Sequence, residues 1–230
     1  MKKTRSGTQF ILAHWYQCLI VCLSVLGSSL QADELNIVVH SASGHAAGNM
    51  VLYATSLNPE ILNEAKSTDP QHSAVMDQVN SQFVPHILVV EKDSWVTFPN
   101  SDSIKHHVYS FSQAKPFELK LYGEGQPAPL QFNNGGEVVL GCNIHDWMLG
   151  YVFVVDTPWF AKTNDKGLAN IALPKGEYEL KLWSPLLQGK DKQFSTIVNV
   201  NGTSEYLIQL TEALLPTFSE YEHADELDDY

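Results

Sequence analysis

Cysteine is scarce in this chain, with three residues among 230, at positions 18, 22 and 142. Cys18 and Cys22 lie in an apolar stretch near the N-terminus, so Cys142 is the only thiol in the rest of the chain. A disulfide framework is therefore excluded as the scaffold of that remainder. A lone thiol in an oxidising compartment is a liability unless something occupies it, and an inert buried cysteine is the alternative.

The N-terminal stretch has the pattern of an export signal. Lys2, Lys3 and Arg5 precede the largely apolar run Phe10–Leu26, and small residues follow up to Ala32. A basic segment, an apolar segment and a small-residue site predict cleavage near Ala32, and an uncleaved membrane anchor is the alternative. Cleavage places the mature protein in the periplasm or outside the cell, without a membrane attachment.

Basic residues are few, at 14 Lys and Arg against 26 Asp and Glu. Three of the basic residues fall in the predicted signal, which leaves 11 against 26 and a mature net charge of about −15. Such a charge excludes nucleic acid and anionic membranes as partners, since both would repel it. A protein partner with a basic surface is the expectation.

Helical periodicity is also rare, and short apolar runs separated by Gly, Pro and Asn predict an all-β fold. We expect a Greek-key β-sandwich and a second, smaller β-sandwich. This second sandwich is either discontinuous, with strands from the N-terminal part of the chain, or formed by the C-terminal strands alone. One short helix is predicted over residues 58–66, with Asn58 as its cap and Pro59 at its first position. The expected organisation is a signal at 1–32, the main sandwich at 73–157, the second sandwich at 158–212 and an acidic disordered tail at 213–230. The N-terminal strands at 33–66 either belong to the second sandwich or stand apart from it.

The side chains best suited to bind a metal are concentrated in one segment. Cys142, His145 and Met148 are spaced three residues apart, between strands predicted at 137–141 and 151–155. A short loop cannot spread these side chains apart, so we expect them to face one small volume. A thiolate, two imidazoles and a weak thioether form the ligand set of a mononuclear blue-copper site. The missing imidazole is predicted to be His106; the adjacent His107 is the alternative, because successive strand residues point to opposite faces.

The motifs around these residues resemble a known family. Phe98-x-Asn100-x5-His106-x-Val108, followed by Gly141-Cys142-x2-His145-x2-Met148, resembles the two ligand segments of cupredoxins such as plastocyanin and amicyanin. The resemblance covers residues 83–155 and implies one type 1 copper held by His106, Cys142, His145 and Met148. The flanks at 35–54 and 163–210 more distantly resemble a carboxypeptidase-regulatory or transthyretin-like sandwich. This arrangement is similar to secreted bacterial proteins labelled methylamine utilisation proteins.

The resemblance also raises questions about the residues around the ligands. His107 stands where plastocyanins carry an Asn that ties the two ligand segments together, which puts that bracing in doubt. Asn100 is expected either to supply a substitute hydrogen bond near Cys142 or to perform ordinary turn chemistry. The edge of His145 is the implied electron port, with Asp146 favouring a basic partner. Trp147 is interpreted either as a partner contact or as core packing.

The predicted function is electron transfer, without bond-making chemistry. Copper sequestration or delivery, and a structural protein with a stabilising metal, are the alternatives. No His-x-His or His-Cys-His motif supports a multicopper enzyme, and no Cys-x-x-Cys-His motif supports heme attachment. A second, looser copper site at His86 or Met76 stays open.

Overall fold

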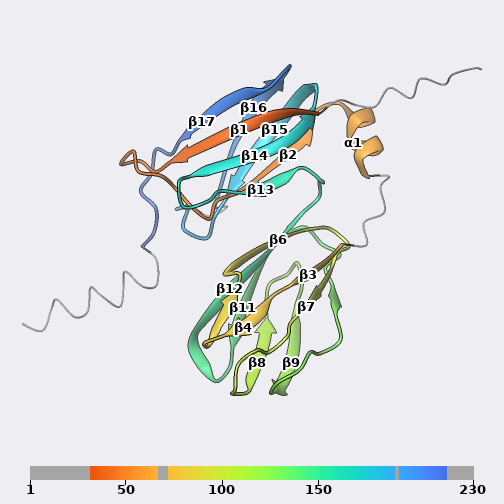
Figure 1. Cartoon of the computed structure of the whole chain (residues 1–230), viewed down its shortest axis with the longest axis vertical. Helices are drawn as coiled ribbons and strands as arrows, with labels where there is room; N and C mark the ends of the chain where they lie inside the picture. Colours follow the sequence, from red (N-terminus) through yellow and green to blue (C-terminus); the bar gives the residue numbers. More distant parts are fainter. Residues whose placement is uncertain (1–31, 67–71, 190–191, 217–230) are drawn as a thin grey trace, which may run out of the picture. The chain divides into compact units, whose positions relative to one another are not determined.

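The computed structural model describes residues 32–66, 72–189 and 192–216 (Figure 1). Of the predicted export signal at 1–32 only Ala32 is described, and of the predicted acidic tail at 213–230 only residues 213–216 are described. The backbone N–H of Leu215 donates to the carbonyl of Leu186 at 2.7 Å, so the first residues of the predicted disordered tail are still held by the fold. In the part of the chain that is described, no helix has the length and apolar character needed to cross a membrane.

The fold is all-β, as predicted. Among the described residues a single helix, α1 (Pro59–Lys66), interrupts the strands. The backbone N–H of Glu60 donates to the side-chain oxygen of Asn58 at 2.9 Å, which is the contact that an N-cap makes. Pro59 occupies the first helical position, where its missing N–H costs no hydrogen bond.

Two sheets combine strands from both ends of the chain. β1 (Ala32–His40) pairs antiparallel with β14 (Leu168–Pro174) and parallel with β17 (Ser204–Gln209). The other sheet has the order β13-β2-β15-β16, with bounds Phe160–Lys162, Val51–Ser56, Gly176–Trp183 and Gln193–Val200. Alternate residues of both sheets, such as Val39, Leu52 and Leu180, are buried in one shared apolar core.

The middle of the chain forms a five-stranded sheet of order β6-β12-β11-β8-β9. Its strands are Ile87–Glu91, His145–Val155, Gly136–Cys142, His106–Ser110 and Phe117–Tyr122. Figure 1 shows β8, β9, β11 and β12 in green to teal beside the shorter strands β3 (Ser73–Val75), β4 (Asp77–Val79) and β7 (Trp95–Thr97). β10 (Leu130–Gln131) pairs with β7, and β5 (Gln82–Val84) pairs with β4. Phe98, Val108, Phe132 and Leu140 lie at the centre of the core here.

Four strands were not foreseen from the sequence, namely β3, β4, β10 and β13. Each has only two or three residues. A run that short cannot display an alternating pattern, so its strand character is set by pairing with a neighbour rather than by its own residues.

Candidate metal centre

The segment carrying Cys142, His145 and Met148 is a hairpin, which corrects the predicted loop. β11 ends at Cys142 and β12 begins at His145, so the turn contains two residues. The pairing jumps from Gly141 opposite Leu149 to Cys142 opposite His145. Three residues of β12 therefore bulge out of the ladder between two paired positions, and bulges re-aim side chains at such sites.

The β8 strand decides between the adjacent histidines. Val108 of β8 pairs with Cys142 of β11. His106 is 0% exposed, while His107 points to the other face and its Nε2 lies 2.8 Å from Oε1 of Glu118. Alternation along the strand thus turns His106 toward Cys142 and His107 away from it.

Three donor groups converge. Nδ1 of His106 lies 3.8 Å from Sγ of Cys142, and Nδ1 of His145 lies 3.6 Å from the same sulfur. The three ligand atoms all lie within 4.8 Å of one another. The two imidazole centroids are 4.9 Å apart, so the rings approach the sulfur from neighbouring directions.

These separations fit one shared metal ion. With the bond lengths of zinc, about 2.3 Å to sulfur and about 2.0 Å to nitrogen, two ligands spread by about 120° lie roughly 3.7 Å apart. The observed sulfur–nitrogen distances of 3.8 and 3.6 Å match that value. A thiol with two imidazoles also suits copper chemically.

Met148 lies in the same apolar core as Cys142 and is 2% exposed. Cys142 and Met148 also line one surface depression of about 510 Å³, together with Tyr109 and Gly141. The thioether is therefore buried near the thiol, and its role as a fourth ligand stays a prediction.

The His145 side of the cluster is open. Trp147 is 54% exposed and its ring centroid lies 5.3 Å from that of His145. Ile144 is also half exposed, and Asp146 faces solvent. Trp147 is thus a surface residue, which excludes the core-packing interpretation.

Asn100 does not hydrogen-bond near Cys142, contrary to one of the two expectations. Its side-chain nitrogen donates to the carbonyls of Ile104 at 2.8 Å and Tyr122 at 3.2 Å. These bonds close the segment that leads into β8, so Asn100 organises its own loop. The two ligand segments are joined instead by the backbone N–H of Asn143, which donates to the carbonyl of His107 at 3.2 Å.

Asp102 is a site residue that the sequence analysis missed. Its Oδ2 lies 2.8 Å from Nε2 of His106. Burial acts to raise the pKa of Asp102, but hydrogen bonds from the Ser81 backbone, the His106 ring and the Asn80 backbone outweigh it and lower the pKa. A carboxylate four residues before a ligand histidine was the available signal, although that spacing alone is common.

The residues proposed for a second copper site lie elsewhere. Met76 is fully buried in the apolar core. The His86 ring packs edge-on against Tyr151, with centroids 5.4 Å apart, and burial lowers the pKa of this histidine. Among the described residues, the group of His, Cys and acidic side chains placed to hold a metal is His106, Cys142 and His145.

No protein-family model and no curated protein matches the sequence. Among solved structures, a copper-containing nitrite reductase from Thermus scotoductus is 24% identical over 36% of this chain, with a TM-score of 0.35, and the match spans 22% of its length. A purple cupredoxin from Nitrosopumilus maritimus is 22% identical over 36% of this chain and 100% of its own, with a TM-score of 0.32. An oxidised amicyanin variant is 20% identical over 45% of this chain and 99% of its own, with a TM-score of 0.34. These TM-scores are below 0.5, so the functional assignment rests on the donor residues of this chain.

Proposed function

We propose that this protein is a cupredoxin-type copper protein that carries single electrons in the periplasm or outside the cell. The observation that carries the proposal is the convergence of one thiol and two imidazole Nδ1 atoms within 4.8 Å. The buried thioether of Met148 completes the proposed ligand set of His106, Cys142, His145 and Met148. Copper bound there would supply a one-electron Cu(II)/Cu(I) couple.

The residues around the cluster favour electron transfer over bond-making. His106 and Cys142 sit on paired strands, and His145 follows a two-residue turn, so all three donors are held by the sheet. Donors fixed in this way move little when the charge at their centre changes. His106, Cys142 and Met148 are each at most 3% exposed, so water has little direct access to these three donors.

The proposed exit for the electron is His145. It is the donor beside the exposed Ile144 and Trp147, so a partner protein can approach its ring. The carboxylate of Asp146 and the mature net charge of about −15 favour a redox partner with a basic surface.

The test is the visible spectrum and the voltammogram of the purified protein with Cu(II). We expect an intense blue or purple colour and reversible one-electron cycling. Cys142→Ser should abolish the colour, and His106→Ala should abolish or strongly alter it. His107→Ala is the matched control on the adjacent, outward-facing residue and should keep it.

A colourless Cu(I) protein that loses its metal readily to chelators would instead support copper delivery or sequestration. Loss of colour in His107→Ala with retention in His106→Ala would overturn the ligand assignment.

A further inference from the structure

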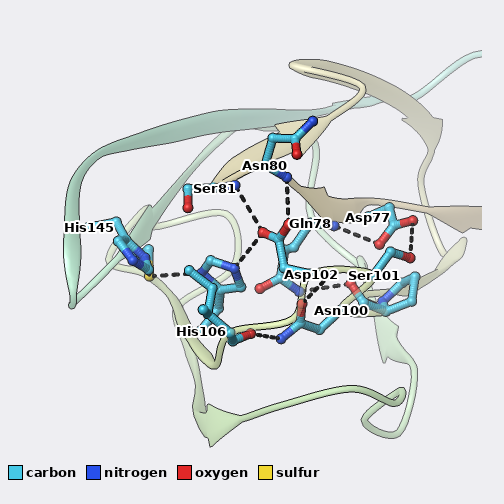
Figure 2. Close-up of polar contacts among 12 residues, drawn as sticks. Asp77, Gln78, Asn80, Ser81, Asn100, Ser101, Asp102, His106 and His145 are labelled. Atoms are coloured by element: carbon cyan, nitrogen blue, oxygen red, sulfur yellow. Dashed lines mark hydrogen bonds and ion pairs between the residues drawn. The ribbon is translucent and has the colours of Figure 1, made fainter.

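Both ring nitrogens of His106 have a defined neighbour. Nδ1 faces the sulfur of Cys142 at 3.8 Å, and Nε2 lies 2.8 Å from Oδ2 of Asp102 (Figure 2). An ionised carboxylate can only accept hydrogen bonds, so the proton of a neutral imidazole must sit on Nε2. That tautomer leaves the lone pair of Nδ1 aimed at the position beside Cys142.

The Asp102 carboxylate is itself held by a turn. The backbone N–H of Asn80 donates to Oδ1 at 2.6 Å, and the N–H of Ser81 donates to Oδ2 at 2.9 Å. Asn80 and Ser81 form the two-residue turn between β4 and β5, with φ of 53° and 54°. Both residues are in the left-handed region, as in a type I′ hairpin turn, and successive backbone amides in turns make anion-binding concavities.

Further bonds fix the loop of Asp102 to the same hairpin. Its backbone N–H donates to Oδ1 of Asn100 at 2.9 Å. The Ser101 hydroxyl donates to a carboxylate oxygen of Asp77 at 2.8 Å, and the Ser101 N–H donates to the carbonyl of Gln78 at 3.1 Å. Figure 2 shows this continuous series of contacts from Asp77 to His106. The carboxylate therefore has little freedom to leave its position.

We propose that Asp102 is the positioning residue of the site. Held by the Asn80–Ser81 turn, it locks His106 as the Nε2–H tautomer and fixes the ring with Nδ1 toward the metal position. Partners of this kind orient ligand histidines and raise their basicity, and removing them typically weakens metal binding 10–100-fold. The identity of the metal rests on the proposed function, but the tautomer of His106 in the metal-free protein does not.

The chain contains a matched control. Glu118 lies 2.8 Å from Nε2 of His107, the same distance that separates Asp102 from His106. The two histidines are adjacent on β8, and each has one carboxylate partner. The His107–Glu118 pair faces away from Cys142, and it is also more exposed, at 19% and 57% against 0% and 11% for His106 and Asp102. Glu118→Gln therefore removes an equivalent charge without touching the site.

The experiment compares Asp102→Ala, Glu118→Gln and the unmodified protein. Nitrogen-15 NMR of the metal-free proteins reports the tautomer of His106, and competition with a chelator reports affinity for Cu(II). We expect a pure Nε2–H tautomer in the unmodified protein and in Glu118→Gln. Asp102→Ala should give a mixture of tautomers and a 10–100-fold weaker affinity, whereas Glu118→Gln should stay within twofold.

An unchanged tautomer in folded Asp102→Ala would overturn the proposal, and so would an equal affinity loss in Glu118→Gln. If Asp102→Ala does not fold, Asp102→Asn decides. The NH2 group that this substitution introduces would face the N–H of Asn80 in one orientation, and the N–H of Ser81 with Nε2 of His106 in the other, so neither orientation satisfies all three donors. We therefore expect a partial tautomer shift and at least a threefold loss of affinity. Unchanged values in that variant would contradict the role. If the unmodified protein binds no copper at all, the proposed function fails while the tautomer measurement still tests Asp102.

Discussion

The two imidazole sides of the donor cluster are built in opposite ways. His106 is fully buried and is braced through Asp102. His145 lies at the start of β12, next to Ile144 and Trp147, which are about half exposed. One side is fixed by hydrogen bonds from the interior, while the other meets solvent. The buried side with His106 would hold a metal, and the exposed side with His145 would give access to it. Substitutions on the two sides should therefore change the free energy of unfolding by different amounts.

The largest difference in stability loss is expected between alanine substitutions of two asparagines, one on each side. Asn100 is 3% exposed, and Asn100→Ala leaves the carbonyls of Ile104 and Tyr122 without their donor. The metal-free protein should lose about 2–3 kcal/mol of unfolding free energy, because buried unsatisfied groups are costly. Asn143→Ala, at the exposed turn on the other side, should cost less than about 0.5 kcal/mol. Urea denaturation measures both, and similar losses would break the contrast.

The next largest effect is expected at high pH, where ionisation of a buried tyrosine should lower the free energy of unfolding. Burial raises the pKa of Tyr122 to about 12, partly offset by a hydrogen bond from Gln78, and the hydroxyl donates to the carbonyl of Phe98 at 2.8 Å. A raised pKa in the folded state means that stability is full below the unfolded value near 10 and is lost as pH rises toward 12. The contribution at stake is about 2 kcal/mol.

Chemical denaturation of the metal-free protein between pH 9 and 12 tests this expectation. Tyr122→Phe should show a shallower loss than the unmodified protein, although other buried tyrosines remain in both. An identical pH dependence would mean that Tyr122 ionises as freely in the folded state as in the unfolded chain.

A smaller loss of stability is expected from a substitution at Gly141, which lies between the buried and the exposed side of the donor cluster. A Cβ added at Gly141, next to Cys142, would lie 2.8 Å from the Tyr109 ring. Gly141→Ala should therefore force the ring aside and cost about 1–2 kcal/mol of unfolding free energy. Adding Tyr109→Ala removes the clash, so the double variant should lose less than the sum of the single variants. Additive losses would show that the ring accommodates the methyl group freely.

The smallest effect is expected at the exposed rim. Trp147→Ala removes a large side chain that is already 54% exposed, so its unfolding free energy should change by less than about 1 kcal/mol. Thermal unfolding of the metal-free protein measures it. A loss comparable to that of Asn100→Ala would mean that the exposed side chain of Trp147 contributes as much to the free energy of unfolding as the buried Asn100.

The sequence was sufficient to predict the all-β class and the residues that converge. The spacing of Cys142, His145 and Met148 confines them to one hairpin whatever the detail of the turn. The sequence did not predict the bulge in β12, because the same residues are compatible with a loop or with a strand. Alternation alone does not say whether His106 or His107 faces inward, so the prediction of His106 rested on the resemblance in spacing from Asn100.

The hydrogen bonds that hold Asp102 could not be predicted from the sequence, for a physical reason. It depends on the turn between β4 and β5, and these strands have three residues each. Neither strand carries a pattern of its own, so the proximity of Ser81 to Asp102 arises only once the sheets have packed. Of the two expectations for Asn100, the bond near Cys142 was wrong, because the carbonyls of Ile104 and Tyr122 accept from its side-chain nitrogen.

β1 lies next to strands from the far end of the chain. Among the described residues its neighbours are β14 and β17, and β2 pairs with β13 and β15. A polypeptide emerges N-terminus first, so β1 and β2 must wait for their neighbours during synthesis. The strands bearing the donors find all their partners by residue 155, where β12 ends beside β6. The donor cluster can therefore assemble while β1 and β2 are still without their partner strands.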